Sequence, residues 1–541
     1  MNNSIFNFKE PKNEPILGYN KGSLERIELE KELVRQSNIE IEIPLIIGGK
    51  EIKTGNIGTV VMPHNHKHIL AKYHKAGEKE IKMAIDAALE ARTEWANMSW
   101  IERASIMIKA AELITKKYRA KVNASTMLGQ SKNVFQAEID SVCETADFLR
   151  FNAFFLSEIF KNQPTIGADN INRLEYRCLE GFVFTVSPFN FTAIGSNLNT
   201  SVAIMGNTTV WKPATTSLLS NYYLMKIYEE AGLPAGVINF IPGQGSLIGK
   251  IVLDHKELAG IHFTGSTDVF NNLWKTVGIN IEKYKSYPKL VGETGGKDFI
   301  FAHESANVDQ LATSIVRGSF EYQGQKCSAA SRAYIPKSIW NNLKSKLVEQ
   351  VSSIKMGDVS DFENFVNAVI DENSFDNIMN YINIAKESPD AKIIVGGNGD
   401  KSKGYFVEPT IIETTDPNFI TMHEEIFGPV MTIYVYEDKK YEETLDICDK
   451  TSPYALTGSI FANDRYAQVL ACKVLRNAAG NFYYNDKPSG AVVGLQPFGG
   501  ARKSGTNDKA GSYLNLIRWI SPRTIKETLI APIDYKYSYM E

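Results

Sequence analysis

A chain of 541 residues is too long for one ordinary domain of about 150 residues, so we expect two or three domains. Hydrophobic residues make up 43% and charged residues 22%, which is typical of a globular protein and excludes a mainly disordered chain. Lysines and arginines number 59 against 62 acidic residues, and the resulting net charge of −3 gives no basic face for nucleic acid.

The targeting signals and the cysteines bear on the compartment. No apolar run reaches the roughly eighteen residues of a membrane helix, so we expect no membrane span. The first residues lack the apolar core of a signal peptide and include acids, which mitochondrial transit peptides avoid. Five scattered cysteines without a CxxC pair predict neither a disulfide framework nor a metal site. We therefore expect a soluble cytoplasmic protein with no metal.

The N-terminal third is predicted to be mainly helical. The first fifty residues are charged and read as an irregular segment that wraps over another surface. Apolar residues between Ile81 and Leu89 recur at three- and four-residue spacing, which predicts an amphipathic helix. Further helices are expected at about 101–118, after the turn at 131–133, and at 148–160.

From Gly181 onward, short apolar runs alternate with helical patterns, which is typical of a parallel α/β sheet. Strands are predicted at 181–187, 208–213, 236–242 and 260–265. The alternation restarts near residue 290 and predicts a second α/β domain. Its helices are expected at about 308–320, 337–353 and 373–387, and its strands at 392–396 and 430–436.

Three polar residues in this region are candidates for covalent chemistry. Cys327 follows Lys326 among small residues, where a cation and free amides can lower a thiol's pKa, although a structural cysteine fits the same setting. Glu293 lies in a glycine-rich turn and could be a general base or simply a solvated turn residue. Asn190 follows a strand, so its amide could donate to an oxyanion.

One turn is a candidate for phosphate binding. Gly265 and Ser266 end a predicted strand and open a helix, whose N-terminal amides would face a phosphate. The turn lacks the GxGxxG spacing of the usual dinucleotide fingerprint, so its local pattern alone decides nothing.

Seven motifs occur in a fixed order along the chain: SPFNF (187–191), WKPA (211–214), FTGS (263–266), ETGGK (293–297), GQKCSA (324–329), EEIFGPV (424–430) and PFGG (497–500). From about residue 45 to 525 the chain resembles the aldehyde dehydrogenase superfamily. The resemblance implies an α/β fold with a Rossmann-type NAD-binding domain, an α/β catalytic domain and a small β oligomerisation flap. These would comprise 1–161 with 181–292, then 293–511, and finally 162–180 with 512–541.

A narrower resemblance rests on residues 136–153, 184–200, 320–332 and 481–511. These segments are similar to the Δ1-pyrroline-5-carboxylate dehydrogenase group of that superfamily. The resemblance implies NAD-dependent oxidation of L-glutamate γ-semialdehyde, which is in equilibrium with Δ1-pyrroline-5-carboxylate, to L-glutamate, the second step of proline degradation. It also implies a thiohemiacetal and a thioester on the nucleophile, and a homodimer or higher homo-oligomer.

Carried over residue by residue, the resemblance implies that Cys327 is the nucleophile, Glu293 the base and Asn190 the oxyanion donor. It implies cofactor contacts at Ser187, Lys212, Gly265, Ser266, Thr267, Asp268, Val269, Glu425 and Phe427. It implies a small-molecule substrate pocket lined by Glu144, Phe191, Lys326, Ser328, Gly490, Ala491 and Phe498.

Two positions depart from the wider superfamily pattern. Thr215 stands where many members carry an acid for the ribose 2′-hydroxyl, which weakens the argument against NADP, and Phe270 stands where a glycine is usual.

The main alternative is an aldehyde dehydrogenase for another semialdehyde, such as succinate semialdehyde. A cysteine acyltransferase would need a histidine partner in a motif-like setting, and none of the eight histidines has one. A binding protein on an inactive scaffold is disfavoured because the three candidate catalytic residues are all present.

Overall fold

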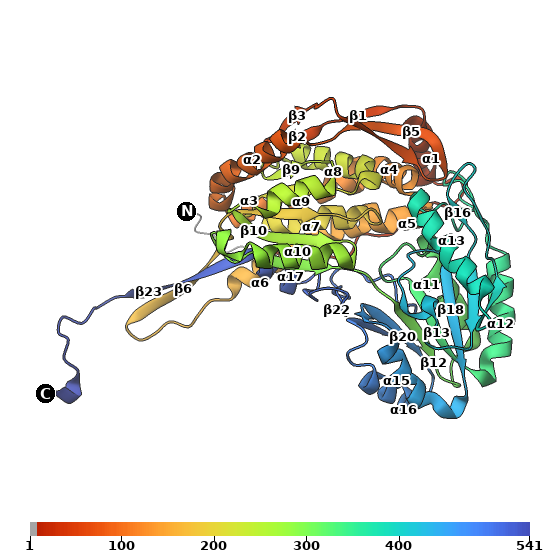
Figure 1. Cartoon of the computed structure of the whole chain (residues 1–541). Coiled ribbons are helices and arrows are strands. Elements are labelled where there is room, and N and C mark those ends of the chain that lie inside the picture. Colours follow the sequence, from red (N-terminus) through yellow and green to blue (C-terminus); the bar gives the residue numbers. More distant parts are fainter. Residues whose placement is uncertain (1–7, 541) are drawn as a thin grey trace.

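Two seven-stranded sheets with helices packed on their faces form the body of the molecule, which confirms the predicted α/β class (Figure 1). The structure is a computed structural model and describes residues 8–540. Within these residues no helix is both long and apolar enough to cross a membrane.

The first sheet contains the strands predicted after Gly181. Its order is β11-β10-β7-β8-β9-β2-β3, and the first five strands run parallel. The order along the chain reverses between β7 and β10, and ligands of open α/β sheets bind outside the carboxyl ends of strands at such a point. The strands are β2 (Leu45–Ile47), β3 (Lys50–Ile52), β7 (Phe182–Val186), β8 (Thr209–Lys212), β9 (Ile238–Phe240), β10 (Leu258–Thr264) and β11 (Lys289–Glu293).

Alternation of side chains along β7 shows why both faces of this sheet are covered. Val183 packs into one hydrophobic cluster, whereas Phe182 and Phe184 pack into another on the opposite face. The helices around this sheet are α2 (Glu78–Asn97), α3 (Trp100–Glu112), α4 (Arg119–Gln130), α5 (Val134–Ala137), α6 (Thr145–Lys161), α7 (Thr192–Ile204), α8 (Leu218–Ala231), α9 (Gly245–Leu253) and α10 (Thr267–Ile279). A π-helical stretch, Glu138–Glu144, joins α5 to α6.

The second sheet has the order β14-β17-β18-β13-β12-β20-β21, with β14 antiparallel to its neighbour. Its strands are β12 (Asp298–Ala302), β13 (Ala330–Pro336), β14 (Ala391–Val395), β17 (Thr410–Thr414), β18 (Val430–Tyr436), β20 (Thr457–Phe461) and β21 (Asn481–Tyr484). Its main helices are α11 (Val308–Phe320), α12 (Lys337–Ser352), α13 (Glu372–Glu387), α15 (Tyr441–Thr451) and α16 (Arg465–Val474). The helices and strands expected here are therefore confirmed.

A two-stranded antiparallel ribbon projects from the body (Figure 1). It pairs β6 (Asn170–Cys178) with β23 (Ile520–Thr528). Both strands lie within the residues predicted for the flap, 162–180 and 512–541. Residues 513–519 were also assigned to the flap, but Leu516 and Trp519 are fully buried in the core of the first sheet, so this stretch belongs to the body. The division into domains otherwise stays a prediction.

The prediction of an irregular first fifty residues is wrong in part. Residues 9–20 form no helix or strand, but α1 (Leu24–Ser37) is a helix, and β1 (Ile41–Ile43) pairs with β5 (Asn65–His74), which also pairs with β4 (Ile57–Met62). Ser23 caps α1 by accepting the Arg26 N–H, whereas only Leu29, Leu33 and Gln36 are buried. With so few buried apolar residues, the helical spacing is hard to recognise among the charged residues, and the helix was not predicted.

Candidate active site

Two cavities of about 310 and 950 Å³ meet at Cys327, which lines both of them. The residue follows a turn in which Tyr322 and Gln323 have φ of 52° and 55°. Such left-handed backbone is unfavourable for residues with a Cβ and persists where surrounding contacts fix it. Here the Gln323 amide donates to the carbonyls of Ser131 and Ala368 at 2.9 and 2.8 Å. The nucleophile candidate is thus held on strained, well-anchored backbone.

Glu293 faces this thiol from the end of β11. The Cys327 Sγ donates to Glu293 Oε1 across 3.5 Å. Burial raises the pKa of Glu293 to about 7, and the hydrogen bond from Cys327 and the charge of Lys509 oppose that rise. This pKa places the carboxyl near the operating range of a general base and argues against a solvated turn residue.

The expected lowering of the Cys327 pKa is wrong for the free site. Burial raises the pKa of the thiol, and the carboxylates of Glu293, Asp298 and Glu425 raise it further. The ammonium of Lys326 is paired with Glu321 at 3.1 Å, so it does not lower the pKa of the thiol. Cys327 is therefore protonated in this structure, and Glu293 is the group placed to take its proton.

Asn190 lies in the loop between β7 and α7, on the wall of the larger cavity. Its Nδ2 donates to the carbonyl of Gln325 at 3.1 Å, two residues before the nucleophile. A carboxamide has two N–H groups, so one holds the nucleophile segment while the second is free to donate. This arrangement suits an oxyanion donor.

The larger cavity opens at the point where the strand order of the first sheet reverses. All the predicted cofactor contacts except Thr267 line it: Ser187, Lys212, Gly265, Ser266, Asp268, Val269, Glu425 and Phe427. Thr267 instead donates to the carbonyl of Lys503 and accepts the N–H of Gly295. Thr267 therefore holds the 265–269 turn in place from outside the cavity.

The electrostatics of the larger cavity fit an anionic dinucleotide. Burial lowers the pKa of Lys212, and no carboxylate in the described chain pairs with it. Ser266 caps α10, whose first amides lie at the same cavity, and such amides together with an ammonium bind phosphates. Burial raises the pKa of Glu425 to about 7 while its Oε1 accepts the Gly296 N–H at 2.8 Å.

The smaller cavity gathers every residue predicted for the substrate pocket, together with Cys327 and Glu293. These residues are Glu144, Phe191, Lys326, Ser328, Gly490, Ala491 and Phe498. Burial raises the pKa of Glu144 well above its usual range, with Asp140 as the next cause, so this carboxyl is neutral and can donate as well as accept. Gly490 has φ of +92°, a conformation that favours glycine.

Sequence reasoning missed a cluster of charges beside this pocket. Lys326 and Lys487 both donate to Glu321 Oε2, at 3.1 and 2.8 Å. Two ammoniums against one carboxylate leave a net charge of 2 − 1 = +1. Lys487 lines the smaller cavity, and its Nζ lies 3.3 Å from where a Cβ of Gly490 would be. The pocket therefore has a positive end.

Sequence reasoning also missed a buried ion pair next to the loop that carries Asn190. Lys132 Nζ donates to Asp140 Oδ2 at 2.6 Å, and both side chains are fully buried. Asp140 also accepts the N–H groups of Thr192 and Ala193, at 3.0 and 2.9 Å, which supplies the cap that the first turn of α7 lacks. The Lys132 ammonium lies 4.2 Å from the ring centroid of Phe191. The pair therefore fixes where Asn190 and Phe191 enter the site.

Comparison with known proteins decides the family. The sequence model of the aldehyde dehydrogenase family matches residues 53–523 of the chain. The chain belongs to the aldehyde dehydrogenase family. A mitochondrial Δ1-pyrroline-5-carboxylate dehydrogenase of Dictyostelium discoideum is 54% identical to this aldehyde dehydrogenase, over 99% of the chain and 96% of that protein. The human mitochondrial enzyme of the same name is 48% identical, over 98% and 94% respectively.

The fold of this aldehyde dehydrogenase is also similar to that of a solved structure. The Δ1-pyrroline-5-carboxylate dehydrogenase of Mycobacterium tuberculosis bound with NAD has a TM-score of 0.96 and 48% identity, and each chain is covered completely. Both resemblances inferred from the motifs, to the superfamily and to this group within it, are therefore confirmed.

Proposed function

We propose that this aldehyde dehydrogenase oxidises L-glutamate γ-semialdehyde to L-glutamate with NAD as the oxidant, as the second step of proline degradation. The observation that carries the proposal is the position of Cys327 between a cavity that fits a dinucleotide and a cavity with a positive end. Relatives named for this activity at about half identity over the whole chain support it.

The chain's own groups account for each proton movement. Cys327 Sγ attacks the aldehyde carbon while its proton passes to Glu293 Oε1, 3.5 Å away. The second N–H of Asn190 and the backbone N–H of Cys327 hold the resulting oxyanion. Lys212 and the turn at Ser266 would hold NAD in the larger cavity, where it would supply the hydride acceptor for this carbon. Glu293 must first release the thiol's proton to solvent, after which it takes a proton from the water that attacks the thioester. That proton passes to the departing Cys327 thiolate, and the glutamate formed gives up its carboxylic acid proton to solvent.

The substrate is a carboxylate, and the net charge of the Lys326–Glu321–Lys487 cluster supports that class. Burial raises the pKa of Glu321, but Lys326 and Lys487 outweigh it, so the carboxyl stays ionised. Burial also lowers the pKa of Lys326 to about 8, so the cluster carries its charge of +1 at pH 7 and loses it as pH rises through 8. Ser328 and the backbone at Gly490 and Ala491 line the same cavity and can donate to a carboxylate. An uncharged aldehyde gains nothing from this cluster.

Replacing Lys487 by methionine tests this substrate class, because the cluster charge then falls from +1 to zero. A charge-assisted hydrogen bond contributes about 1.5–3 kcal/mol, so kcat/KM for glutamate semialdehyde should fall at least tenfold. Turnover of propanal should change less than threefold. Lys473→Met, which changes an exposed lysine on α16, is the matched control and should leave both rates unchanged.

Steady-state NADH formation from glutamate semialdehyde, succinate semialdehyde and propanal provides the measurement. Glutamate semialdehyde should give the highest kcat/KM, and NAD should exceed NADP because no arginine follows Lys212 locally to bind a 2′-phosphate. A preference for succinate semialdehyde would favour the alternative semialdehyde dehydrogenase. An equal loss for all substrates in Lys487→Met would show that Lys487 acts through the fold.

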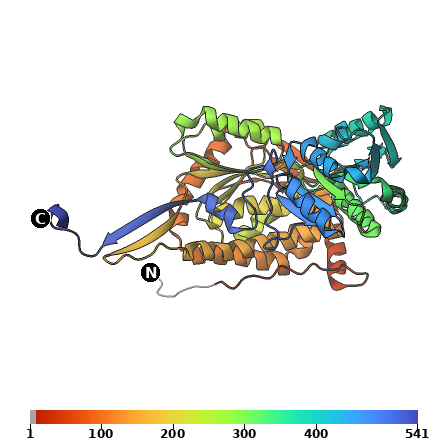
Figure 2. The ribbon, with the colours of Figure 1, turned by 90° about the horizontal axis from the view of Figure 1, so that it is seen from below.

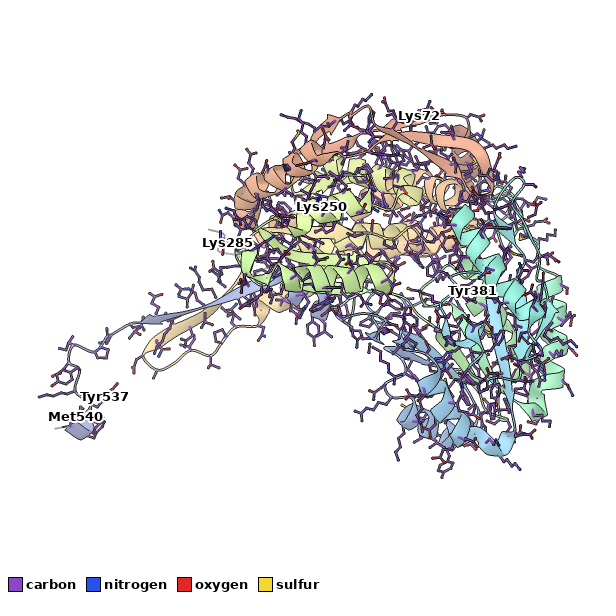
Figure 3. All side chains as sticks on the ribbon, in the orientation of Figure 1. Lys72, Lys250, Lys285, Tyr381, Tyr537 and Met540 are labelled. Carbon is purple, nitrogen blue, oxygen red and sulfur yellow. The ribbon has the colours of Figure 1, made fainter. Side chains whose placement is uncertain are left out.

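We infer that the chain assembles into a homodimer or larger oligomer through the β6–β23 ribbon. An isolated two-stranded ribbon is marginally stable in water, so a partner surface is expected to cover it. Beyond it the tail carries exposed apolar residues, Ile530, Ile533, Tyr535 and Tyr537, and Tyr537 and Met540 lie far from the body (Figure 3). Light scattering at micromolar concentration should give at least twice 60.4 kDa, and a single-chain particle would contradict the inference.

We propose the cytoplasm as the compartment. Five free cysteines support it, whereas the relatives from Dictyostelium discoideum and human both carry "mitochondrial" in their names. Fractionation of cells that express the full chain provides the test, and co-purification with a matrix marker would overturn the proposal.

A further inference from the structure

An extended segment near the N-terminus, residues 9–19, runs alongside the helices of the first domain; we call it the N-terminal arm (Figure 2). Three of its residues, Asn13, Glu14 and Ile16, line the smaller cavity, the same cavity that contains Cys327 and Gly490. The family match begins at residue 53, so the arm lies outside the residues matched to the family as a whole. It is nevertheless part of the wall of the proposed aldehyde pocket.

Charged groups fix the arm to the helical side of the pocket. The Glu14 carboxylate is bound by Arg119 at 2.8 Å and by Arg150 at 2.6 Å, and the side chains of all three residues are mostly buried. The Glu14 N–H also donates to Asp147 Oδ1 at 2.7 Å. Further along, the Tyr19 hydroxyl donates to Glu138 Oε2 at 2.7 Å. With so many charge-assisted bonds the arm has a defined position.

A single side chain joins the arm to the opposite wall. Asn13 Nδ2 donates to Asp147 Oδ2 on α6 and to the carbonyl of Val493, each at 2.8 Å. Val493 is buried and lies two residues after Ala491, in the loop that lines the pocket near Lys487. The Asn13 carboxamide therefore sets the distance between the helix and this loop.

An apolar rim completes the outer part of the cavity. Ile16 on the arm and Phe135 on α5 both line it, and their side chains are 53% and 49% exposed. They occupy the exposed mouth of the pocket, whereas the inner end contains Glu293 and Cys327, which are half-buried. Because these residues line the exposed part of the cavity that contains Cys327, a long aldehyde bound to Cys327 would extend toward the rim and the arm.

We propose that the N-terminal arm is the outer wall of the aldehyde pocket, and that Asn13 holds it so that the pocket accepts short carboxylate-bearing aldehydes and rejects longer ones. Asn13 and Ile16 are thus specificity-determining residues of the proposed reaction, and the inference rests on the assignment of the smaller cavity as the aldehyde site. Asn13 acts by positioning the wall, since it bonds to Asp147 and Val493 and to no group at the nucleophile.

Asn13→Ala provides the first test, with kcat/KM measured for glutamate semialdehyde and for straight-chain aldehydes from propanal to octanal. Loss of two hydrogen bonds frees the loop that begins at Gly490, so the rate for glutamate semialdehyde should fall about tenfold. The ratio of octanal to propanal should rise at least threefold, because propanal is too short to reach the arm. The matched control is Asn20→Ala, which changes an exposed asparagine just beyond the arm and should alter neither.

Ile16→Trp provides the opposite test and changes an exposed side chain, so folding should tolerate it. The larger side chain narrows the mouth, and the octanal to propanal ratio should fall at least threefold. Unchanged ratios in both variants, or an equal loss for every aldehyde including propanal, would overturn the proposal. If the unmodified protein oxidises aldehydes but not glutamate semialdehyde, the proposed function fails, and the chain-length ratios still decide the role of the arm.

Discussion

Replacing Cys327 by alanine should abolish NADH formation, by at least about 10⁴-fold, while leaving the affinity for NAD within about twofold. Cys143 also lines the smaller cavity, but among the cysteines of the described chain only Cys327 lines both cavities and contacts Glu293. Removal of a covalent nucleophile eliminates the reaction path itself, and comparable deletions in other enzymes cost four to six orders of magnitude, roughly. The dinucleotide contacts come from other residues, so binding should persist.

Stopped-flow absorbance measures the loss, and titration calorimetry measures NAD binding. Cys472→Ala is the matched control, because Cys472 is an exposed cysteine on α16 and should tolerate the change without loss of rate. Substantial residual turnover in Cys327→Ala would show that the nucleophile has been assigned to the wrong residue.

Replacing Glu293 by glutamine should separate acylation from hydrolysis. Glutamine keeps the shape of the side chain but cannot take a proton from water, so hydrolysis of the thioester should slow by about 10²-fold or more. One equivalent of NADH per site should still form in a burst, at a rate reduced by loss of the proton acceptor for the thiol. Mass spectrometry after rapid quench should then find the acylated Cys327 peptide. A wild-type steady-state rate would refute this role for Glu293.

The pKa of Glu293 also predicts a pH dependence. Burial raises the pKa to about 7, and the base acts only when ionised, so hydrolysis of the thioester should accelerate as pH rises from 6 to 8. The free energy of unfolding should instead decrease as pH rises. Between the ordinary pKa and about 7 the folded state binds more protons than the unfolded state, so the free energy of unfolding contributed by this group is lost as pH rises. Glu293→Gln should flatten both profiles, which chemical denaturation and rapid-quench rates can check.

Much of the fold follows from periodicity that is local in the sequence. Helix α11 spans Val308–Phe320, the range its apolar spacing predicts, and β10 is mostly apolar without alternation because all its residues are buried. The catalytic trio was predicted from motif order and resemblance, since Asn190, Glu293 and Cys327 are far apart in the chain and only the folded sheets bring them together.

Other features of the site depend on tertiary contacts that no local pattern reveals. Lys487 reaches Glu321 across 166 positions of sequence, and Asn13 reaches Val493 across 480. The π-helical turn at Glu138–Glu144 has no 3.6-residue period, so the orientation of its acidic residues could not be inferred. The expected effect of Lys326 on the thiol failed for a similar reason, because adjacency in sequence did not show that its ammonium is bound to Glu321.

The buried pair of Lys132 and Asp140 bears on how sequence variants of this protein should be classified. Neither residue lines either of the two cavities of the site, so a substitution at either position would ordinarily be sorted with folding defects. Removal of one partner leaves an uncompensated buried charge, which costs about 3–5 kcal/mol, and a lower protein level would be the first symptom. The same change releases the first turn of α7 and with it Asn190, so the molecules that do fold would carry a misplaced oxyanion donor. A chaperone or stabilising ligand that restored the amount of protein would leave that second defect in place.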